Sequence, residues 1–501
     1  MKSFSKSKLM AYRQCAKRLW LEFHRPELRE DSAASEARFK VGHEVGEIAR
    51  RIYDPDEKGI LLDVGRDGYD AVFRESQALL RSTKPVFEAG FAAHGAYAFA
   101  DVMRPAHAKG RKGWRMVEVK SSSEVKDYHR DDAAVQAFAA RGAGVPLLSV
   151  ALAHIDTSWT YPGGGDYAGL LVEHDLTEEA FSREAEVRQW IAGARAVVAQ
   201  PEEPDLPMGR HCGEPWPCGF AGYCESEAPQ VEYPVQWLPR ATSKGLRQLF
   251  DEGIVDMRDV PDDLLNERQL RVKKHTLSGR RYFDAEGAEK ALSSYGLPAY
   301  FLDFETIQFA VPVWKGTRPY QQIPFQFSVH RLSRTGKLAH QGFLDMSGGD
   351  PSKAFAEALI AACGERGPVF AYNAPFENTR IKELAERYPR LRRDLLAIVE
   401  RVVDLRPVAE KHFYHPGQQG SWSIKKVLPA VAPDLKYEDL DGVQDGGMAM
   451  AVYLEAIHPE TSAARKAEIE EQLMNYCALD TYAMVRLWQY FVGASVVVRA
   501  T

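Results

Sequence analysis

The chain has 501 residues, of which 45% are hydrophobic and 27% are charged, a composition typical of soluble globular proteins. Its length predicts two or three domains. No apolar run reaches the ~20 residues of a membrane helix, and the basic N-terminus lacks the apolar core of a secretory signal. We therefore expect no membrane partner and a cytoplasmic location. The net charge of −6 gives no overall signature of nucleic-acid binding, but a local basic groove is compatible with it.

Two strand-like segments in the first domain, predicted at residues 1–225, carry acidic and basic residues. Asp101 lies in one of them, and Glu118 and Lys120 lie in the next. Because side chains alternate along a strand, Glu118 and Lys120 share a face, and a neighbouring strand brings Asp101 beside them. An acid pair that binds a metal, with a lysine beside the attacking water, forms a compact phosphodiesterase site. A helix is predicted to pack behind this site and to direct the Gln136 side chain towards it. We expect Gln136 to contact nucleic acid there.

This pattern resembles the PD-(D/E)xK nucleases, and in particular their RecB-like branch. The resemblance implies that Asp101 and Glu118 bind a metal and that Lys120 is the catalytic lysine. Members of that branch often carry a histidine ligand on an upstream glycine-rich helix, and the matching run here is VGHEVGE. His43 and Glu47 in this run lie four residues apart and share a helix face, so either can serve, and His43 is the predicted ligand.

Six cysteines in a chain expected in the cytosol are not predicted to form disulfides. Cys363 and Cys477 lie in apolar segments and are predicted to be small core residues. The other four are one cysteine near the N-terminus and three within thirteen residues: Cys15, Cys212, Cys218 and Cys224. Several RecB-like nucleases hold a [4Fe–4S] cluster with one cysteine before the nuclease core and three after it. The resemblance therefore implies such a cluster here, with a structural role.

Zinc is the alternative occupant of the cysteine site, because thiolates bind zinc as well as iron–sulfur clusters. The C-x5-C-x5-C spacing is looser than the C-x2-C pairs of a zinc ribbon and favours the cluster. His211, next to Cys212, keeps a mixed cysteine and histidine zinc site open.

Residues 226–298 are polar and helical, and we interpret them as a helical connector. A new α/β pattern is expected over residues 299–491, followed by a tail at 492–501. This pattern opens with an apolar run that contains Asp303 and Glu305, which share one face if the run is a strand. Two carboxylates at the end of a buried strand are costly unless a cation lies between them.

Two later segments of the C-terminal domain add further ligands. Glu377 follows a second predicted strand, at the start of a helix. Tyr476 and Asp480 lie four residues apart on a predicted helix and share one face. Oxygen ligands of this kind suit Mg²⁺ or Mn²⁺. Two such ions about 3.5–4 Å apart promote in-line hydrolysis of a phosphodiester.

The runs LDFET, YNAPFE and YCALD resemble the three motifs of the DEDD exonucleases, a ribonuclease H-like superfamily that includes polymerase proofreading domains. The Tyr-x3-Asp form of the last motif resembles the tyrosine subclass. The resemblance implies that Tyr476 positions the attacking water and that four carboxylates bind two metals: Asp303, Glu305, Glu377 and Asp480. The second motif usually supplies an aspartate, where this chain has Glu377.

A short helix around residues 421–429 is predicted to line the substrate groove, with Lys425 and Lys426 facing phosphate. A solvated helix face is the alternative interpretation. Asp404 follows another predicted strand, and we expect it to have a structural or helix-capping role rather than to bind a metal.

We therefore expect an α/β multidomain chain with a restriction-endonuclease-like PD-(D/E)xK domain, a helical connector and a ribonuclease H-like exonuclease domain. The whole chain resembles a family of bacterial proteins that join a RecB-like nuclease to such an exonuclease. The resemblance implies a metal-dependent nuclease that trims DNA from 3′ ends and has a second, N-terminal nuclease site. Two alternatives remain open: a nucleic-acid-binding scaffold with one or both sites inactive, and an exonuclease directed at RNA.

Overall fold

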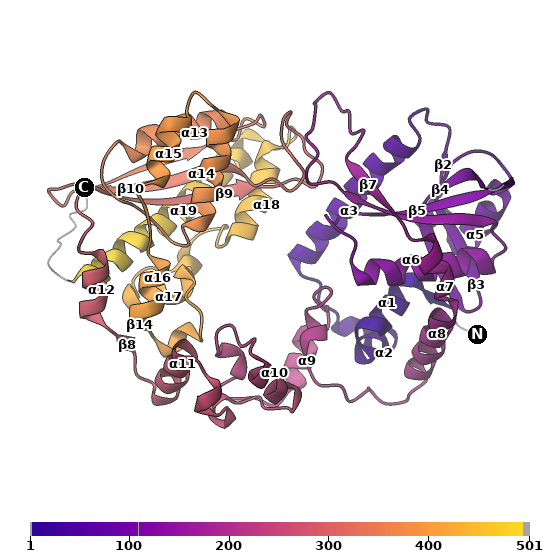
Figure 1. The fold of residues 1–501 in the computed structure, drawn as a ribbon, viewed down its shortest axis with the longest axis horizontal. Helices are drawn as coiled ribbons and strands as arrows, with labels where there is room; N and C mark the ends of the chain where they lie inside the picture. The colour runs from indigo at the N-terminus through magenta and orange to yellow at the C-terminus, as the bar shows by residue number, and fades with distance from the viewer. Residues whose placement is uncertain (1–2, 109, 494–501) are drawn as a thin grey trace. The chain divides into compact units, whose positions relative to one another are not determined.

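The computed structural model describes residues 3–108 and 110–493, which form two compact units of mixed helices and strands (Figure 1). Unit 1 runs to Pro229 and also includes Phe309–Gln321. Unit 2 contains Gln230–Gln308 and continues from Gln322. The predicted α/β class is confirmed. Apart from its first two residues, the expected tail at 492–501 lies outside the described residues.

Unit 1 is built on a mixed sheet that has seven strands among the residues described. The strands are β1 (Phe4–Ser5), β2 (Ile60–Leu61), β3 (Val86–Ala93), β4 (Ala96–Ala108), β5 (Arg111–Lys120), β6 (Leu147–Ile155) and β7 (Leu171–Asp175). Their order is β2-β3-β4-β5-β6-β7, and β1 pairs with β4. Strands β3, β4 and β5 are antiparallel neighbours, whereas β5 and β6 are parallel. The predicted strands that carry Asp101 and Glu118 are therefore adjacent, as β4 and β5.

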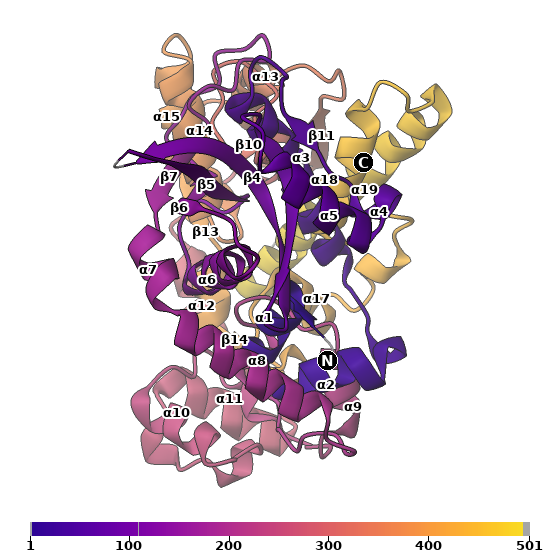
Figure 2. The same ribbon diagram turned by 90° about the vertical axis from the view of Figure 1, so that its right-hand side faces the viewer.

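Helices surround the sheet of unit 1. They are α1 (Lys6–Gln14), α2 (Ala16–His24), α3 (Ala33–Tyr53), α4 (Val64–Asp67), α5 (Tyr69–Leu79), α6 (Asp127–Gly142), α7 (Thr177–Ser182), α8 (Glu184–Val198) and α9 (Ala221–Glu227). Helix α6 packs on strands β3, β4 and β6 (Figure 2). The buried side chains Ala133, Ala137 and Ala140 lie along one face of α6 and join the apolar core of the sheet. Their small size lets α6 approach the strands that carry the acidic residues.

Unit 2 contains a second mixed sheet, with five strands in the described residues, in the order β11-β10-β9-β12-β13. The strands of unit 2 are β8 (Tyr282–Phe283), β9 (Ala299–Ile307), β10 (Ile323–Leu332), β11 (Leu338–Leu344), β12 (Val369–Ala371), β13 (Val402–Asp404) and β14 (Phe413–Tyr414). Strand β9 lies in the middle, antiparallel to β10 and parallel to β12. Strands β8 and β14 form a separate pair.

The helices of unit 2 are α10 (Lys244–Asp251), α11 (Glu267–Ser278), α12 (Ala285–Leu292), α13 (Ser352–Cys363), α14 (Pro375–Arg387), α15 (Arg392–Val399), α16 (Arg406–His412), α17 (Ile424–Val431), α18 (Gly446–Ile457) and α19 (Ala463–Val492). Buried apolar residues of the segment expected to be a connector, such as Leu246 and Val272, belong to the same core as Phe301 of β9 and Trp488 of α19. The segment expected as a separate connector at 226–298 therefore packs mainly as part of unit 2.

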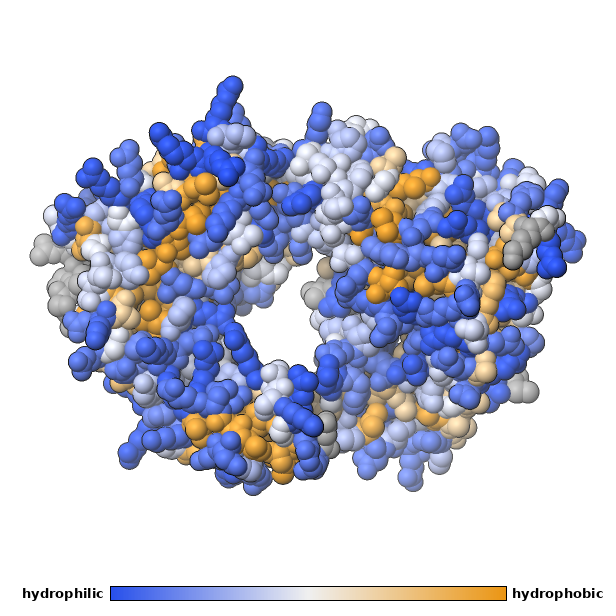
Figure 3. All heavy atoms as spheres, in the orientation of Figure 1, coloured by the Kyte–Doolittle hydropathy of each residue, from blue (hydrophilic) through white to orange (hydrophobic). Residues whose placement is uncertain are grey.

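The polarity of the surface and the hydropathy of the helices agree with the charged and hydrophobic fractions of the sequence. On the face drawn in Figure 3, hydrophilic residues cover most of the surface. In the described part of the chain, no helix is both long enough and apolar enough to cross a membrane.

Candidate functional sites

The acidic residues of β9 lie on the face of the strand that α19 covers. Alternation along β9 places Tyr300, Leu302 and Phe304 in one apolar cluster and leaves the opposite face to Phe301 and the two acids. Phe301 packs edge-to-face on Trp488 of α19, with ring centroids 5.9 Å apart.

Buried hydrogen bonds also hold α19 to the sheet. The Thr481 hydroxyl lies 2.6 Å from the Ser328 hydroxyl and 2.8 Å from Nδ1 of His330, both on β10. Because Ser328 pairs with Asp303 across the strands, these contacts place the neighbouring Asp480 over Asp303.

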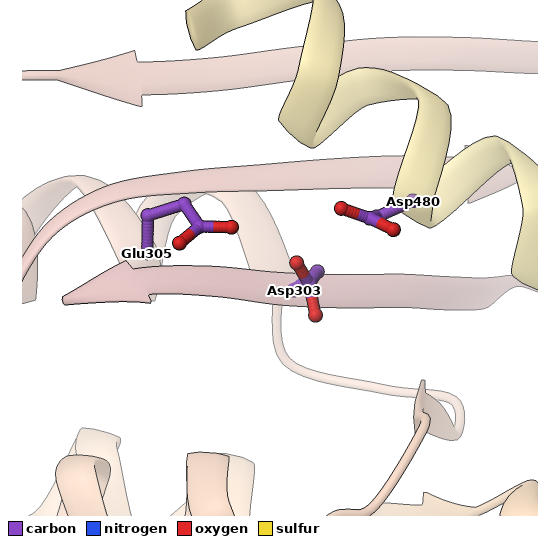
Figure 4. Close-up of side chains that lie close together, drawn as sticks. All are labelled: Asp303, Glu305 and Asp480. Carbon is purple, nitrogen blue, oxygen red and sulfur yellow. The ribbon is translucent and has the colours of Figure 1, made fainter. Parts of the chain in front are cut away.

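Three carboxylates converge between β9 and α19 (Figure 4). Oxygen atoms of Asp303, Glu305 and Asp480 all lie within 4.8 Å of one another, and this is the one such group of three potential ligands among the described residues. Two unit charges at that distance repel by about 3 kcal/mol in a partly solvated protein environment. A cation or protonation relieves this repulsion, and the hard oxygen atoms of the three carboxylates are of the type that Mg²⁺ or Mn²⁺ prefers.

Burial raises the pKa values of the three carboxyl groups, and mutual repulsion adds to the shift at Asp303 and Glu305. Burial, followed by the charges of Asp480 and Glu305, raises the pKa of Asp303 well above its usual value. Burial and Asp480 raise the pKa of Glu305 to about 8. Burial raises the pKa of Asp480 to about 6, although a hydrogen bond from Tyr437 and the charge of Lys425 oppose the shift.

Glu377 supplies a fourth carboxylate from the first turn of α14, as predicted from its place after β12. Its side chain is buried, and its Oε2 atom has no hydrogen-bond partner. Burial, followed by the charge of Asp404, raises its pKa to about 8. The charge of Glu377 contributes to the raised pKa of Asp303, but Glu377 is not in the group of three ligands that lie within 4.8 Å of one another. An unpaired buried oxygen beside an acidic group is the donor that a divalent cation requires.

A cluster of two tyrosines and a lysine borders the carboxylates. Tyr476 lies one helical turn before Asp480, and Lys425 Nζ donates to the Tyr476 hydroxyl over 3.3 Å. Lys425 Nζ also lies 5.0 Å from the ring centre of Tyr437 and 5.1 Å from that of Tyr476. The structure thus places Lys425 at the site. Lys426 instead points to Gln419, over 3.1 Å, on the exposed side of α17.

Tyr437 is the residue of this site that the sequence did not reveal. Its hydroxyl donates to Asp480 Oδ1 over 2.5 Å. Tyr437 lies in a short 3-10 turn (Tyr437–Asp439) that no motif marks, and only the packing of that turn beside α19 brings it to Asp480.

Asp404 has the capping role predicted for it. Its Oδ1 atom accepts the backbone N–H of Arg406, at the start of α16, over 2.9 Å and the backbone N–H of Asn373 over 3.0 Å. These bonds fix the turn that leads into α14 and hence the position of Glu377.

In unit 1, Glu118 is the centre of the N-terminal site. It is 1% exposed, and its Oε1 atom accepts hydrogen bonds from Lys120 over 2.6 Å and from Lys6 over 2.8 Å. Its Oε2 atom accepts from Gln136 over 2.5 Å, as expected for a residue of α6 pointing towards the site. The Oε1 atom of Gln136 is buried without a partner, which leaves an acceptor for a further group at this site.

Lys6 and Asp132, which the motif did not include, complete the N-terminal site. Lys6 Nζ lies 3.2 Å from Asp132 Oδ2, and Lys120 Nζ lies 2.5 Å from the same oxygen. Lys6 begins α1, more than a hundred residues before Glu118, so only the pairing of β1 with β4 brings it here. Lys6, Lys120, Glu118 and Asp132 therefore form one network of ion pairs at this site.

The charges of the N-terminal site affect its two predicted metal ligands in opposite directions. Burial opposes ionisation of Glu118, but Lys120 and Lys6 together hold its pKa well below the usual value. Burial and the charge of Glu118 raise the pKa of Asp101 well above its usual value. Asp101 Oδ2 accepts the backbone N–H of Val119 over 2.6 Å, which ties Asp101 to β5.

His43 is not gathered with the two acids. It is exposed on α3, and no group of three close ligands in the described residues includes His43, Asp101 or Glu118. Glu47, the other candidate in this run, is also exposed and lies 4.0 Å from Arg50.

The four predicted cysteine ligands line one pocket in unit 1, together with His211. Cys15 comes from the junction of α1 and α2, and Cys212, Cys218 and Cys224 come from the segment around α9. All are free thiols. Burial raises the pKa values of Cys15, Cys218 and Cys224, and the charges of neighbouring cysteines raise them further. The four thiols thus surround a common space, as a shared metal centre requires.

No three of the four sulfur atoms lie within 4.8 Å of one another in the described part of the chain. Cys363 and Cys477 are fully buried, as predicted.

Comparison with known proteins gives one family match. A family model described as a domain of unknown function (DUF2779) matches residues 300–423. The matched segment contains Asp303, Glu305 and Glu377 and ends before Lys425 and Asp480. No curated protein matches the chain.

In the absence of divalent metal, we expect the protein to lose stability as the pH rises. Glu305 and Glu377 have folded-state pKa values of about 8, above the ~4.3 of an unfolded glutamate. The folded state binds these protons more tightly, so this stability is present below pH ~4 and is lost as the pH rises to ~8. Calorimetry in EDTA measures the decline, which Glu305→Gln is expected to flatten. A melting temperature that is independent of pH in both proteins contradicts this expectation.

Replacement of a pocket cysteine should remove the metal centre. We expect anaerobically purified Cys218→Ser protein to lose the visible absorbance of a [4Fe–4S] cluster and to melt at a lower temperature. Cys363→Ser, a buried cysteine outside the pocket, is the control that should keep the absorbance. Colourless wild-type protein with one equivalent of zinc would assign the pocket to zinc instead.

Proposed function

We propose that this chain is a metal-dependent nuclease whose unit 2 removes nucleotides from 3′ ends, with DNA favoured over RNA. The observation that carries the proposal is the convergence of Asp303, Glu305 and Asp480 within 4.8 Å on a buried face. Glu377, whose buried Oε2 atom has no hydrogen-bond partner, is proposed as the fourth carboxylate. This arrangement supports the ribonuclease H-like, DEDD architecture that the three motifs imply.

In this proposal Asp303, Glu305, Asp480 and Glu377 would hold two Mg²⁺ or Mn²⁺ ions. The ions, when bound, lower the pKa of water and stabilise charge on the phosphate and the leaving oxygen. The residues around them have separate tasks. Tyr437 fixes the orientation of Asp480 through its hydrogen bond, the Tyr476 hydroxyl orients the attacking water, and Lys425 offsets the negative charge and contacts the scissile phosphate.

Unit 1 is proposed to carry a second phosphodiesterase site of the RecB-like PD-(D/E)xK type. Glu118 and Asp101 would hold the metal, and the Lys120 ammonium, which is paired with Glu118 and Asp132, would donate a hydrogen bond that orients the attacking water. The ion pairs of Glu118 keep it ionised, which a metal ligand requires. Asp101 would lose its proton when a cation binds beside it. The cysteine pocket is proposed to hold a structural [4Fe–4S] cluster that joins the α1–α2 segment to the region around α9.

The decisive test is a cleavage assay on end-labelled single- and double-stranded DNA and RNA with Mg²⁺ or Mn²⁺. Asp303→Asn should slow shortening from 3′ ends by at least a hundredfold, because a neutral amide neither balances nor holds the ions. A loss of this size corresponds to a rise in the activation free energy on the order of 3 kcal/mol. The same change removes a buried repulsion, so the metal-free variant should melt no lower than wild type.

Lys120→Ala is the control for the other site. It should leave 3′-end shortening unchanged and remove a second activity of unit 1. Persistence of every activity in the Asp303→Asn, Lys120→Ala double variant is the result that defeats both assignments. Wild-type protein that binds nucleic acid but cleaves none of the substrates supports the scaffold alternative.

Lys425 and Lys426 are adjacent in α17, so substitution of Lys426 is a matched control for substitution of Lys425. We expect Lys425→Ala to slow 3′-end shortening by about tenfold or more, since a charge-assisted contact contributes roughly 1.5–3 kcal/mol. Lys426→Ala should have little effect, because its side chain contacts only Gln419. Rate measurements at saturating DNA distinguish the two, and equal effects of both substitutions would show that Lys425 has no special role.

A further inference from the structure

One segment of the predicted exonuclease sequence folds as part of unit 1. Residues 309–321 leave β9 after Ile307 and return to β10 at Ile323. The Tyr320 N–H donates to the Phe309 carbonyl over 2.7 Å and closes the segment into a loop. We call residues 309–321 the inserted loop.

The inserted loop is hydrogen-bonded into unit 1 through its backbone. The Gly316 N–H donates to the Tyr161 carbonyl over 2.8 Å, and the Tyr161 N–H donates to the Thr317 carbonyl over 3.0 Å. On the other side of the loop, the Tyr167 hydroxyl donates to the Pro312 carbonyl over 3.3 Å. Thr317 is 1% exposed, so these bonds are shielded from water.

Apolar contacts fasten the inserted loop to α3 and to the sheet. Ala310 and Val311 are almost completely buried in one cluster with Val45 and Ile48 of α3. Val119 of β5 and the Tyr320 ring pack against the same cluster. The loop therefore contributes to the core beneath β5 rather than lying on its surface.

The inserted loop contacts both residues that flank Lys120 in the chain, Val119 and Ser121. Val119, on one side, packs in the loop's apolar cluster, and its N–H holds the Asp101 carboxylate. Ser121, on the other side, accepts a short hydrogen bond at its carbonyl from the Tyr320 hydroxyl. Because side chains alternate along a strand, support at Val119 and Ser121 fixes the direction in which Lys120 points, towards Glu118.

We propose that the inserted loop is a positioning element of the N-terminal site, and that Tyr320 is its principal positioning residue. The loop holds the end of β5 from behind, so that Lys120, Glu118 and Asp101 keep their mutual geometry. The N-terminal nuclease sequence is thus incomplete by itself and takes a supporting segment from within the exonuclease sequence. This inference rests on the proposed phosphodiesterase activity of unit 1.

Two full-length variants test the role of Tyr320. Tyr320→Phe keeps the ring in its apolar cluster and removes only the hydrogen bond to Ser121. Tyr167→Phe is the matched control, since it removes a tyrosine hydrogen bond to Pro312 of the same loop rather than to a chain neighbour of Lys120. Both are made in the Asp303→Asn protein, so that only Lys120-dependent cleavage remains.

We expect Tyr320→Phe to lower kcat for Lys120-dependent cleavage by about tenfold with little change in KM, as a displaced catalytic group does. Amide hydrogen exchange at residues 118–122 should also become faster. Tyr167→Phe should alter neither quantity. A change in KM with unchanged kcat would contradict a positioning role.

The exchange measurement separates failure of this inference from failure of the proposed activity. If the Asp303→Asn protein shows no Lys120-dependent cleavage, the assignment of activity to unit 1 is wrong, and exchange alone decides the role of the loop. Faster exchange at residues 118–122 in Tyr320→Phe, but not in Tyr167→Phe, supports the inference. Unchanged exchange in Tyr320→Phe overturns it, whatever the rates of cleavage.

Discussion

Repulsion between buried carboxylates is the constraint around which unit 2 is organised. Asp303 and Glu305 share one face of a central strand, and α19 covers that face and adds Asp480. The surrounding structure holds these groups together against their repulsion. Phe301 and Trp488 anchor the helix to the strand, Tyr437 orients Asp480, and Lys425 supplies positive charge. An apolar scaffold thereby holds three carboxylates together at a short distance despite their repulsion.

Unit 1 resolves a similar problem with residues of its own. Glu118 is more deeply buried than Asp303 and Glu305, which are half-buried, yet Lys6 and Lys120 contact it directly and hold its pKa well below the usual value. The two sites therefore differ in their expected dependence on metal. Burial and mutual repulsion raise the pKa values of Asp303 and Glu305 in unit 2, whereas in unit 1 the pKa of Glu118 is lowered and that of Asp101 is raised.

The boundary between the two units does not follow the order of the sequence motifs. Residues 230–298, polar on average, place enough apolar side chains in the core of unit 2 to belong to it. The inserted loop, which lies between two strands of unit 2, has its partners in unit 1, where Val311 is buried against α3. Each unit is therefore defined by where its apolar side chains are buried.

The sequence by itself determined on which face of its strand or helix each predicted ligand lies, because local periodicity controls that face. Alternation along β9 and helical spacing in α19 predicted the faces of Asp303, Glu305 and Asp480, and the cysteine pattern predicted four residues that line one pocket. Tertiary structure alone decided the partners that arrive from distant segments. Lys6 reaches Glu118 through the pairing of β1 with β4, Tyr437 reaches Asp480 through an irregular turn, and His43 stays exposed. Local patterns fix which way a side chain points, whereas its neighbours depend on how separate segments pack, which no local pattern encodes.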